Sequence, residues 1–408
     1  MKRIAQVQLA RGLLSVSRAR GIVGRWLSTR AGALLAAAAV LVVLSMTSRL
    51  RPTAMDNYVW LADAWLHGKL WLPHFPGAWI DAMPYHGKAW IIEAPAPALL
   101  LLPFVAAFGL TTNQTILGVT LGALGAFGFW RLGQQLGLKS RVLALFTGVI
   151  VFGTSIAFCA TEGAVWFVAH LAAFAFTSLA LAELFNDGRG WLVAFWAILA
   201  AFSRYPLLLA IPVYPAMIYL RKRRIAPLIG YCWVIGPAIL ASMAYNYARW
   251  GTVQEIGFAL WYRIMDERSA GGRPPFDVRN IGMQLHAFLL QGPLVTRTFP
   301  WVRADKFGLS LTWTTPALIV ALFARKPTAE IMALWTLAIL TAVPALLYYD
   351  LGGVQLGMRH GLDFLPFLCA LMLFALRGQW ARRTFTVLAA YSIVFGAYQL
   401  FLWETLPL

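Results

Sequence analysis

The chain has 408 residues, of which 60% are hydrophobic and 12% are charged, and its formal net charge is +18. Apolar runs close to the ~20 residues that cross a bilayer as a helix recur along it. They do not alternate apolar and polar residues as the strands of a membrane barrel would. The composition therefore predicts an all-α polytopic membrane protein, because backbone groups in lipid must be satisfied within helices or closed barrels.

The positive charge lies in short clusters between the apolar runs. Lysine and arginine accumulate in this way in the cytoplasmic loops of membrane proteins. The charge is thereby explained without a nucleic-acid partner, and the lipid bilayer is the first partner expected.

Residues 1–30 carry basic side chains from Lys2 to Arg30 among scattered apolar ones. The basic region of a cleaved signal peptide is normally shorter. We therefore expect a cytoplasmic amphipathic segment that leads into an uncleaved anchor. Residues 31–408 then form a single membrane-embedded domain.

The apolar runs predict about eleven transmembrane helices, judged by the length that a span requires. Another run, 94–110, is short and contains three prolines, which remove backbone donors and interrupt helices. The weakest boundary is at Ser203–Pro206, because a merged span over 190–220 would invert the second half of the chain. The expected spans are 31–48, 113–132, 141–160, 164–186, 190–203, 205–220, 226–245, 308–324, 329–348, 362–376 and 384–403.

The basic clusters decide how residues 94–110 are placed. If this run does not cross and the N-terminus is cytoplasmic, every short basic loop falls on the cytoplasmic side, as the positive-inside rule requires. If it crosses, all of those loops fall outside. We therefore expect a re-entrant or in-plane helix within a first external loop that covers 49–112. All acids except Glu183, Asp187 and Glu330 then lie on the external side or at its edge.

The first external loop opens with a short amphipathic helix that ends near Gly68. Asp56, Trp60, Asp63 and His67 are spaced to share one face of it. A carboxylate held there could act as a general base on an acceptor hydroxyl. The alternative is that Asp56 only caps the helix, because Thr53 stands three residues before it.

A β-hairpin is expected next, with His86-Gly87 as its two-residue turn. The turn would direct Lys88 and Glu93 towards the membrane edge, where Lys88 could contact a phosphate as a point charge. The alternative for Lys88 is an ordinary solvated side chain.

Three further places hold charged side chains at the ends of spans. Glu162 lies in a tight external connection, and an ionisable group there is costly without a partner. Arg204 is flanked by apolar stretches and must find an anion, carbonyl groups or water. Arg359 and His360 begin a late span together with Asp363, which could instead neutralise Arg359 four residues earlier on a helix. Lone His170 is read as a hydrogen-bonded packing residue.

The soluble-enzyme motifs are missing from the sequence. It contains no P-loop, no dinucleotide-binding glycine motif, no nucleophile elbow and no Cys/His metal spacing. The three cysteines fall in apolar spans and are expected to be small buried hydrophobes. No cofactor is demanded. A divalent cation stays open as an alternative, and external carboxylates would have to hold it.

Several of these features, in this order, resemble the GT-C superfamily of integral-membrane glycosyltransferases. The resemblance covers roughly 45–370 and rests on pattern rather than an invariant signature. The first loop lacks a paired-acid Asp-x-Asp motif, which leaves metal dependence open. The matching segments are Asp56 in MDNYVWLADAWLHGKL, the hairpin and helix YHGKAWIIEAPAPALLLLP, Glu162, the segment YNYARWGTVQEIGF that opens the long external loop 246–307, and RHGLDFLPFL.

The resemblance implies an inverting transferase that moves a sugar from a polyprenyl-phosphate donor to an acceptor on the external face of the inner membrane. Asp56 would be the catalytic base and Glu162 a second acid. Lys88, Arg204 and Arg359 would contact the phosphate, and we count Asp63, Glu93 and His360 among the substrate-binding candidates. The acceptor, a glycan, lipid or protein, would be selected by 246–307. The alternative is a transporter or flippase of a lipid-linked or anionic substrate, which would show repeat symmetry and charges near the midplane.

Overall fold

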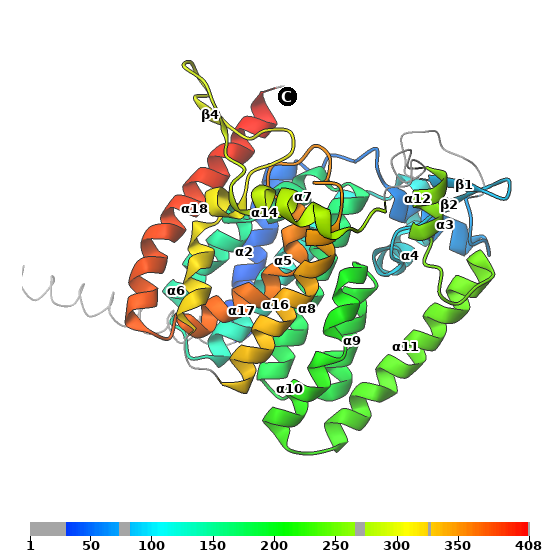
Figure 1. The fold of residues 1–408 in the computed structure, drawn as a ribbon, viewed down its shortest axis with the longest axis horizontal. Helices are drawn as coiled ribbons and strands as arrows, with labels where there is room; N and C mark the ends of the chain where they lie inside the picture. Colours follow the sequence, from blue (N-terminus) through cyan, green and yellow to red (C-terminus); the bar gives the residue numbers. More distant parts are fainter. Residues whose placement is uncertain (1–29, 73–81, 266–273, 325–327, 407–408) are drawn as a thin grey trace, which may run out of the picture.

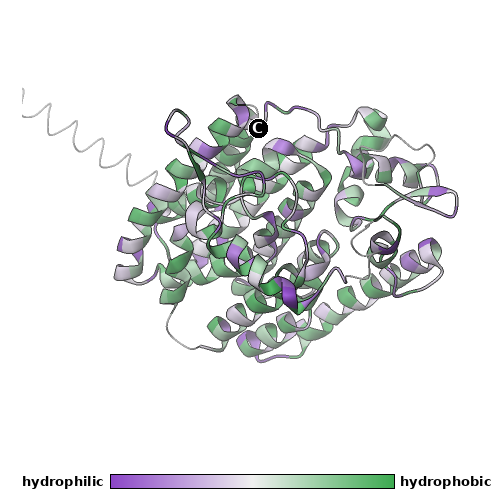
Figure 2. Cartoon of the chain, turned by 45° about the horizontal axis from the view of Figure 1, so that its top comes forward, coloured by the Kyte–Doolittle hydropathy of each residue, from purple (hydrophilic) through white to green (hydrophobic). Residues whose placement is uncertain are grey.

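The computed structural model describes residues 30–72, 82–265, 274–324 and 328–406. The predicted basic segment 1–30 therefore lies almost wholly outside the described residues. Within them the chain is mostly helical, and its strands form two short two-stranded sheets. Helices are predominantly hydrophobic along their lengths, whereas hydrophilic residues gather on the connecting loops (Figure 2). The all-α character expected from the sequence is confirmed.

Six helices are long and apolar enough to cross a bilayer by length and composition, within the described residues. A seventh span is possible if the bent pair α6 (Ser140–Gly148) and α7 (Ile156–Glu162) counts as one. The π-helical turn Val149–Gly153 extends α6, and the bend of 52° falls between Gly153 and Ile156. These helices are compatible with a multi-pass membrane protein. They are α2 (Arg30–Ser48), α5 (Gln114–Gln135), α8 (Val165–Phe185), α11 (Ala226–Trp250), α16 (Ala329–Leu347) and α18 (Gln379–Thr405).

The full count of eleven spans is not confirmed, because four expected spans contain only shorter helices. Two are the single helices α9 (Gly190–Ala201) and α17 (Leu365–Ala375). A third divides into a 3-10 helix (Tyr205–Ala210) and α10 (Val213–Lys222). The fourth divides into α15 (Leu311–Thr314) and a 3-10 helix (Pro316–Phe323). Prolines at the starts of these 3-10 segments lack the donor that a continuous α-helix needs.

Helix α8 lies at the centre of the bundle, since 94% of its apolar 18-residue stretch is buried inside the protein. Its closest neighbour, α5, presents glycines to it. A β-carbon on Gly125 would lie 2.8 Å from the Phe174 ring, and one on Gly128 would collide with Ser178. Small residues allow helix backbones to approach closely in membrane proteins, where burial of apolar surface gives little driving force.

The first loop contains α3 (Asn57–Leu66), strands β1 (Ala82–Tyr85) and β2 (Lys88–Ile91), α4 (Ala96–Phe108) and a 3-10 turn (Gly109–Thr111). The loop begins and ends at the same end of the bundle, because Asn113 donates to the Leu50 carbonyl at 2.7 Å and Thr115 to the Arg51 carbonyl at 2.8 Å. Helix α4 is also shorter than the ~20 residues of a span. Both facts support the prediction that 94–110 does not cross; its angle to a bilayer stays a prediction.

The hairpin turn is confirmed. Tyr85 pairs with Lys88, and the two residues between them, His86 and Gly87, have φ angles of +50° and +69°. Positive φ at both central positions is what a two-residue turn needs to match the twist of its strands.

The chain turns back between α9 and the 3-10 helix that follows it, so the boundary at 203–206 is real. Arg221, at the end of α10, donates to the carbonyls of Leu184 and Phe185 at the end of α8. Residues 190–222 therefore leave one end of the bundle and return to it. The alternative of one merged span over 190–220 is wrong, and Arg204 lies at the turning point.

The long loop is ordered where the structure describes it. It contains α12 (Phe258–Ile264), a 3-10 turn (Val278–Asn280), α14 (Ile281–Leu289) and the short strands β3 (Leu294–Val295) and β4 (Val302–Arg303). Backbone bonds from Asp277 to Leu347 and from Tyr349 to Pro275 join it to the end of α16. A last 3-10 helix, Arg359–Asp363, precedes α17.

Helix α11 contacts α9 near its start, where Gly230 lies against Trp191, but most of its surface is exposed. Only 11% of its apolar 18-residue stretch is buried. Cys232 on this helix is exposed, whereas Cys159 and Cys369 are buried. The expectation that all three cysteines are buried is therefore wrong for Cys232. The last turns of α11 lie beside α3, α4, α12 and the β1–β2 hairpin (Figure 1).

Candidate functional site

A buried ion cluster joins three parts of the chain that are far apart in the sequence. The Asp363 carboxylate has no exposed side-chain surface. It accepts from Arg204 at both oxygens, with Nε to Oδ1 at 3.0 Å and Nη2 to Oδ2 at 2.8 Å, and its Oδ1 also lies 3.1 Å from His170 Nδ1. Two parallel bonds of this kind fix a guanidinium in one plane. Asp363 thus pairs with Arg204, and the alternative in which it neutralises Arg359 is not supported.

His170 is a hydrogen-bonded packing residue, as predicted, but its partner is a charge. It lies in the second turn of α8, which brings it under the 3-10 helix that carries Asp363. Sequence spacing could not reveal this contact, because the two residues are separated by 193 positions.

Arg359 and His360 lie at the edge of this cluster. His360 Nδ1 is 3.5 Å from Arg204 Nη2, and the Arg359 guanidinium carbon lies 5.3 Å from the centroid of the Phe167 ring. Arg359 Nε and His360 Nε2 are buried and have no hydrogen-bond partner within the described residues. Burial and the two nearby arginines hold the pKa of His360 well below its usual range, so it is neutral at pH 7.

The backbone of Gly352 closes over these two side chains. Its φ is +91°, and a β-carbon built on it would lie 3.1 Å from Arg359 Nε and from His360 Nε2. Glycine is therefore favoured here by its backbone conformation, and a β-carbon would also press on the two side chains. The buried nitrogens face the loop that follows α16.

Asp56 occupies the residue before α3, but its side chain makes no capping bond. It accepts instead from Trp60 Nε1 at 3.1 Å, one turn along the helix. The capping alternative is therefore not supported. Burial raises the pKa of the Asp56 carboxyl, because a charge loses hydration there.

Asp56 is held at the first turn of α8. The carbonyl of its neighbour Met55 accepts from the Val165 backbone N–H at 2.9 Å. The side chains of Trp166 and Phe167, directly after Val165, support the Arg359 guanidinium. The first turn of α8 therefore connects the carboxylate of the first loop to the cationic end of the ion cluster.

Glu93 and Tyr58 provide a second connection between the first loop and the ion cluster. Glu93 Oε1 accepts from Asn57 Nδ2 at 3.3 Å, and both side chains are buried. The neighbouring Tyr58 is completely buried, within electrostatic reach of Glu93 and Arg204. The predicted residues Glu93, from the first loop, and Arg204, from the turn after α9, thus both act electrostatically on Tyr58.

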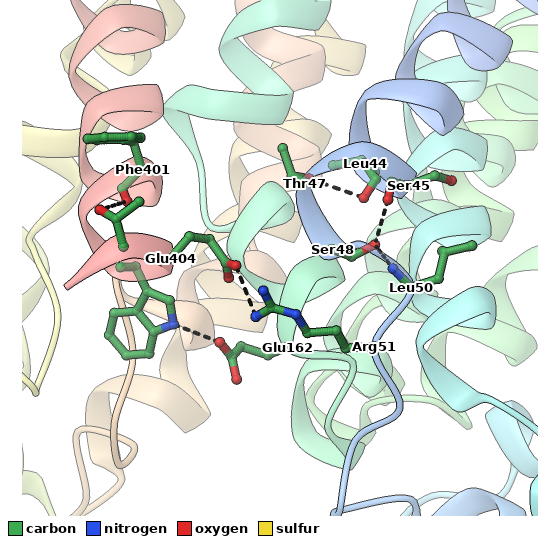
Figure 3. A network of polar contacts seen from close by, with 11 residues as sticks. Leu44, Ser45, Thr47, Ser48, Leu50, Arg51, Glu162, Phe401 and Glu404 are labelled. Atoms are coloured by element: carbon green, nitrogen blue, oxygen red, sulfur yellow. Dashed lines mark hydrogen bonds and ion pairs between the residues drawn. The ribbon is translucent and has the colours of Figure 1, made fainter. Parts of the chain in front are cut away.

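Glu162 has a different environment. It ends α7, and its Oε1 accepts from Trp403 Nε1 of α18 at 2.7 Å, next to a 3.3 Å ion pair between Arg51 and Glu404 (Figure 3). Its hydrogen-bond partner therefore comes from α18 and not from the first loop.

Two predicted residues, Asp63 and Lys88, contact side chains close to them in the first loop. Asp63 lies 3.5 Å from His67 one turn later on α3, as the shared helical face predicts. Lys88 is exposed, and its Nζ lies 3.4 Å from the centre of the Trp71 ring. A cation over an indole face is stabilised by the ring quadrupole. Lys88 is thus held by an aromatic side chain rather than simply solvated.

Sequence reasoning missed Arg249, which is 4% exposed and lies in the last turn of α11. The available signal was its position between Tyr245 and Trp250 at the end of an apolar helix, because aromatic rings can hold a guanidinium against their faces.

No group of three or more His, Cys, Asp or Glu side chains that could hold a metal occurs in the part of the chain that the structure describes. The residues described there do not form a site for the divalent cation that the sequence left open. We therefore derive no chemical step through a metal.

Comparison of the chain with protein-family models, with curated proteins and with solved structures gives no match in any of the three.

Proposed function

We propose that this protein is a membrane glycosyltransferase of the GT-C type, which moves a sugar from a polyprenyl-phosphate donor to an acceptor hydroxyl on the external side of the inner membrane. The observation that carries the proposal is the position of Asp56. The carbonyl of its neighbour Met55 accepts from Val165 in the first turn of α8, and Trp166 in the same turn lies against the Arg359 guanidinium, so the partly buried Asp56 and this cation are attached to one helix end. A base and cations at one helix end are the groups that such a transfer requires.

The reaction would proceed in one displacement. The Asp56 carboxylate takes the proton of the acceptor hydroxyl, whose oxygen attacks the anomeric carbon. The bond from that carbon to the phosphate oxygen breaks, its electron pair stays on the phosphate, and the configuration inverts. Cationic groups would stabilise the charge that develops on the leaving phosphate.

The raised pKa of Asp56 suits a base. A carboxylate that binds its proton more tightly takes one from an alcohol more readily, provided that the pH keeps it ionised. Within the proposal, Asp363 orients Arg204 through its two bonds.

The transporter or flippase alternative is favoured by one observation. The bend of 52° between α6 and α7 interrupts an apolar segment, and interrupted helices line substrate sites in transporters. The ion cluster at the external end of α8 favours the enzyme. Purified protein with a labelled donor separates the two, since a transferase makes product in detergent and a flippase needs two membrane leaflets.

The test of the proposed base is Asp56→Asn, which keeps the shape and the contact with Trp60. We expect transfer from a polyprenyl-phosphate sugar to fall at least ~100-fold, the lower end of the range for general base catalysis. Asp187→Asn, at the opposite end of α8, is the matched control and should retain activity. Undiminished transfer by properly folded Asp56→Asn would refute the assignment.

A further inference from the structure

The β3–β4 hairpin carries large apolar side chains that face away from the protein. Val295 is 78% exposed, and Phe299 and Trp301 are each more than half exposed. The two rings pack edge to face with their centroids 5.3 Å apart, so they form one apolar surface at the turn. Exposed apolar groups gathered in this way mark an interaction surface.

Helix α18 holds the hairpin in place. The Gln399 side chain donates from Nε2 to the Val302 carbonyl at 3.0 Å, and its Oε1 accepts from the Ala304 backbone N–H at 2.9 Å. The Tyr398 hydroxyl donates to the Pro300 carbonyl in the turn. Tyr398 and Gln399 lie about two turns before the end of α18, so the hairpin has a fixed level along this helix.

The exposed face of α18 shows where lipid would contact this helix. Large exposed side chains recur every seven residues, which places them on one helical face: Trp380, Val387, Val394 and Phe401. Residues 380 to 401 cover about 32 Å at 1.5 Å per residue, close to the thickness of the hydrocarbon layer. Tyr398 follows Val394 by four residues and precedes Phe401 by three, so it lies on the same face. The hairpin is therefore attached on the apolar face of α18, near the end of its apolar length.

The hairpin consequently projects over the side of α18 that lipid would cover. In Figure 1 it stands out from the bundle beside the last turns of this helix. Aromatic side chains concentrate at this level of membrane proteins, where their rings rest between the hydrocarbon and the head groups. The exposed rings of the turn thus lie where an interface would receive them.

The charge of the hairpin matches the same layer. Residues 291–307 contain three basic side chains, Arg297, Arg303 and Lys306, all exposed, against one acid, Asp305. Long basic side chains can bury their stems in an apolar layer and keep their charge in the polar one. Basic groups beside apolar ones also favour surfaces that contain anionic lipids.

We propose that the β3–β4 hairpin binds the phospholipid surface beside α18, with its aromatic turn in the interface and the charge of Arg297 among the head groups. The inference does not depend on glycosyl transfer, because it rests on α18 and its hairpin alone. Lipid contact would hold the last turns of α18, whose Trp403 donates to Glu162. The hairpin would thus steady the end of the bundle at which this predicted acid lies.

The test places a fluorescent label on the hairpin and measures its contact with lipid. Cys232→Ser removes the exposed native thiol, and Val295→Cys then carries bimane on the full-length protein in nanodiscs of phosphatidylcholine and phosphatidylglycerol. Acyl chains brominated near the head group quench bimane on contact. Val394→Cys on α18 is the lipid-exposed reference, and Val354→Cys, an exposed valine in the loop that closes over the ion cluster, is the matched control.

We expect quenching at Val295→Cys to exceed that at Val354→Cys by at least about twofold, because rings in the interface lie at the depth of the brominated segment. It should approach the quenching at Val394→Cys. Equal quenching at Val295→Cys and Val354→Cys would overturn the proposal and assign the turn to a protein partner outside the membrane.

A second arm asks whether the aromatic rings hold the hairpin in the lipid. Phe299→Asp with Trp301→Asp should reduce the quenching to the level of the control, since carboxylates are costly in an apolar layer. Quenching that persists in this double variant would contradict the proposal. If Val295→Cys fails to fold, Thr298→Cys in the same turn carries the label, and the same comparisons decide.

Discussion

Removing one partner of the Arg204–Asp363 pair should destabilise the protein strongly. Asp363→Leu takes away a carboxylate with 0% side-chain exposure, while the Arg204 side chain, 23% exposed, keeps limited contact with water. Breaking a buried pair costs about 3–5 kcal/mol, because the remaining charge is left uncompensated. The partial exposure of Arg204 places the expected cost at the lower end, about 3 kcal/mol.

The double variant distinguishes this reason from a simple loss of packing. Arg204→Met with Asp363→Leu removes both charges and leaves apolar groups of similar length. Such replacements are often neutral within about 1 kcal/mol, although His170 loses its partner here. The double variant should therefore be more stable than either single one, with a coupling energy above about 2 kcal/mol.

The free energy of unfolding can be measured by SDS titration of the purified protein in mixed micelles, followed by circular dichroism. Asp277→Asn is the control, since it alters an exposed ion pair that should contribute nothing measurable. Additive effects of the two single changes, or single effects below about 1 kcal/mol, would show that the pair is not the buried charge compensation described here.

Three other perturbations test separate features. Transfer activity should be full above the raised pKa of Asp56 and fall as the pH drops through it. The acid limb of the pH–rate profile should therefore lie above 3.8, the usual pKa of an aspartate. A limb at or below that value would contradict the effect of burial on this carboxyl. Gly352→Ala should lower the free energy of unfolding by about 1–2 kcal/mol because of its positive φ. Gly353→Ala, which has open space, is its control, and equal effects would refute the strain. Trp403→Phe keeps the ring contact with Phe158 but removes the donor to Glu162, and should cost about 1–2 kcal/mol in the same titration, whereas exposed Trp380→Phe should cost nothing.

The parts of the fold that follow from local chemistry were predictable from the sequence. Positive φ at His86 and Gly87 follows from a two-residue turn between strands, and α2, α5 and α8 follow from uninterrupted apolar runs. The 3-10 helix Pro316–Phe323 was not predictable as such. Hydropathy shows that 308–324 is apolar, yet it does not distinguish a tight helix from a span.

The candidate site was predictable residue by residue but not in its contacts. An arginine at position 204 must find an anion, and the sequence identified that need. Its partner Asp363 is 159 positions away, and no periodicity relates the two. Arg249 was missed because the sequence shows its charge but not the aromatic rings and the β2 carbonyl that surround it.

The exposed thiol on α11 gives the molecule a built-in attachment point. Cys159 and Cys369 are fully enclosed in the bundle, so an apolar maleimide should modify Cys232 selectively without any engineered cysteine. A nitroxide at this position would report lipid contact along α11 by its relaxation with dissolved oxygen. The native chain can thus carry a spectroscopic probe on the least buried of its six long apolar helices in the described residues.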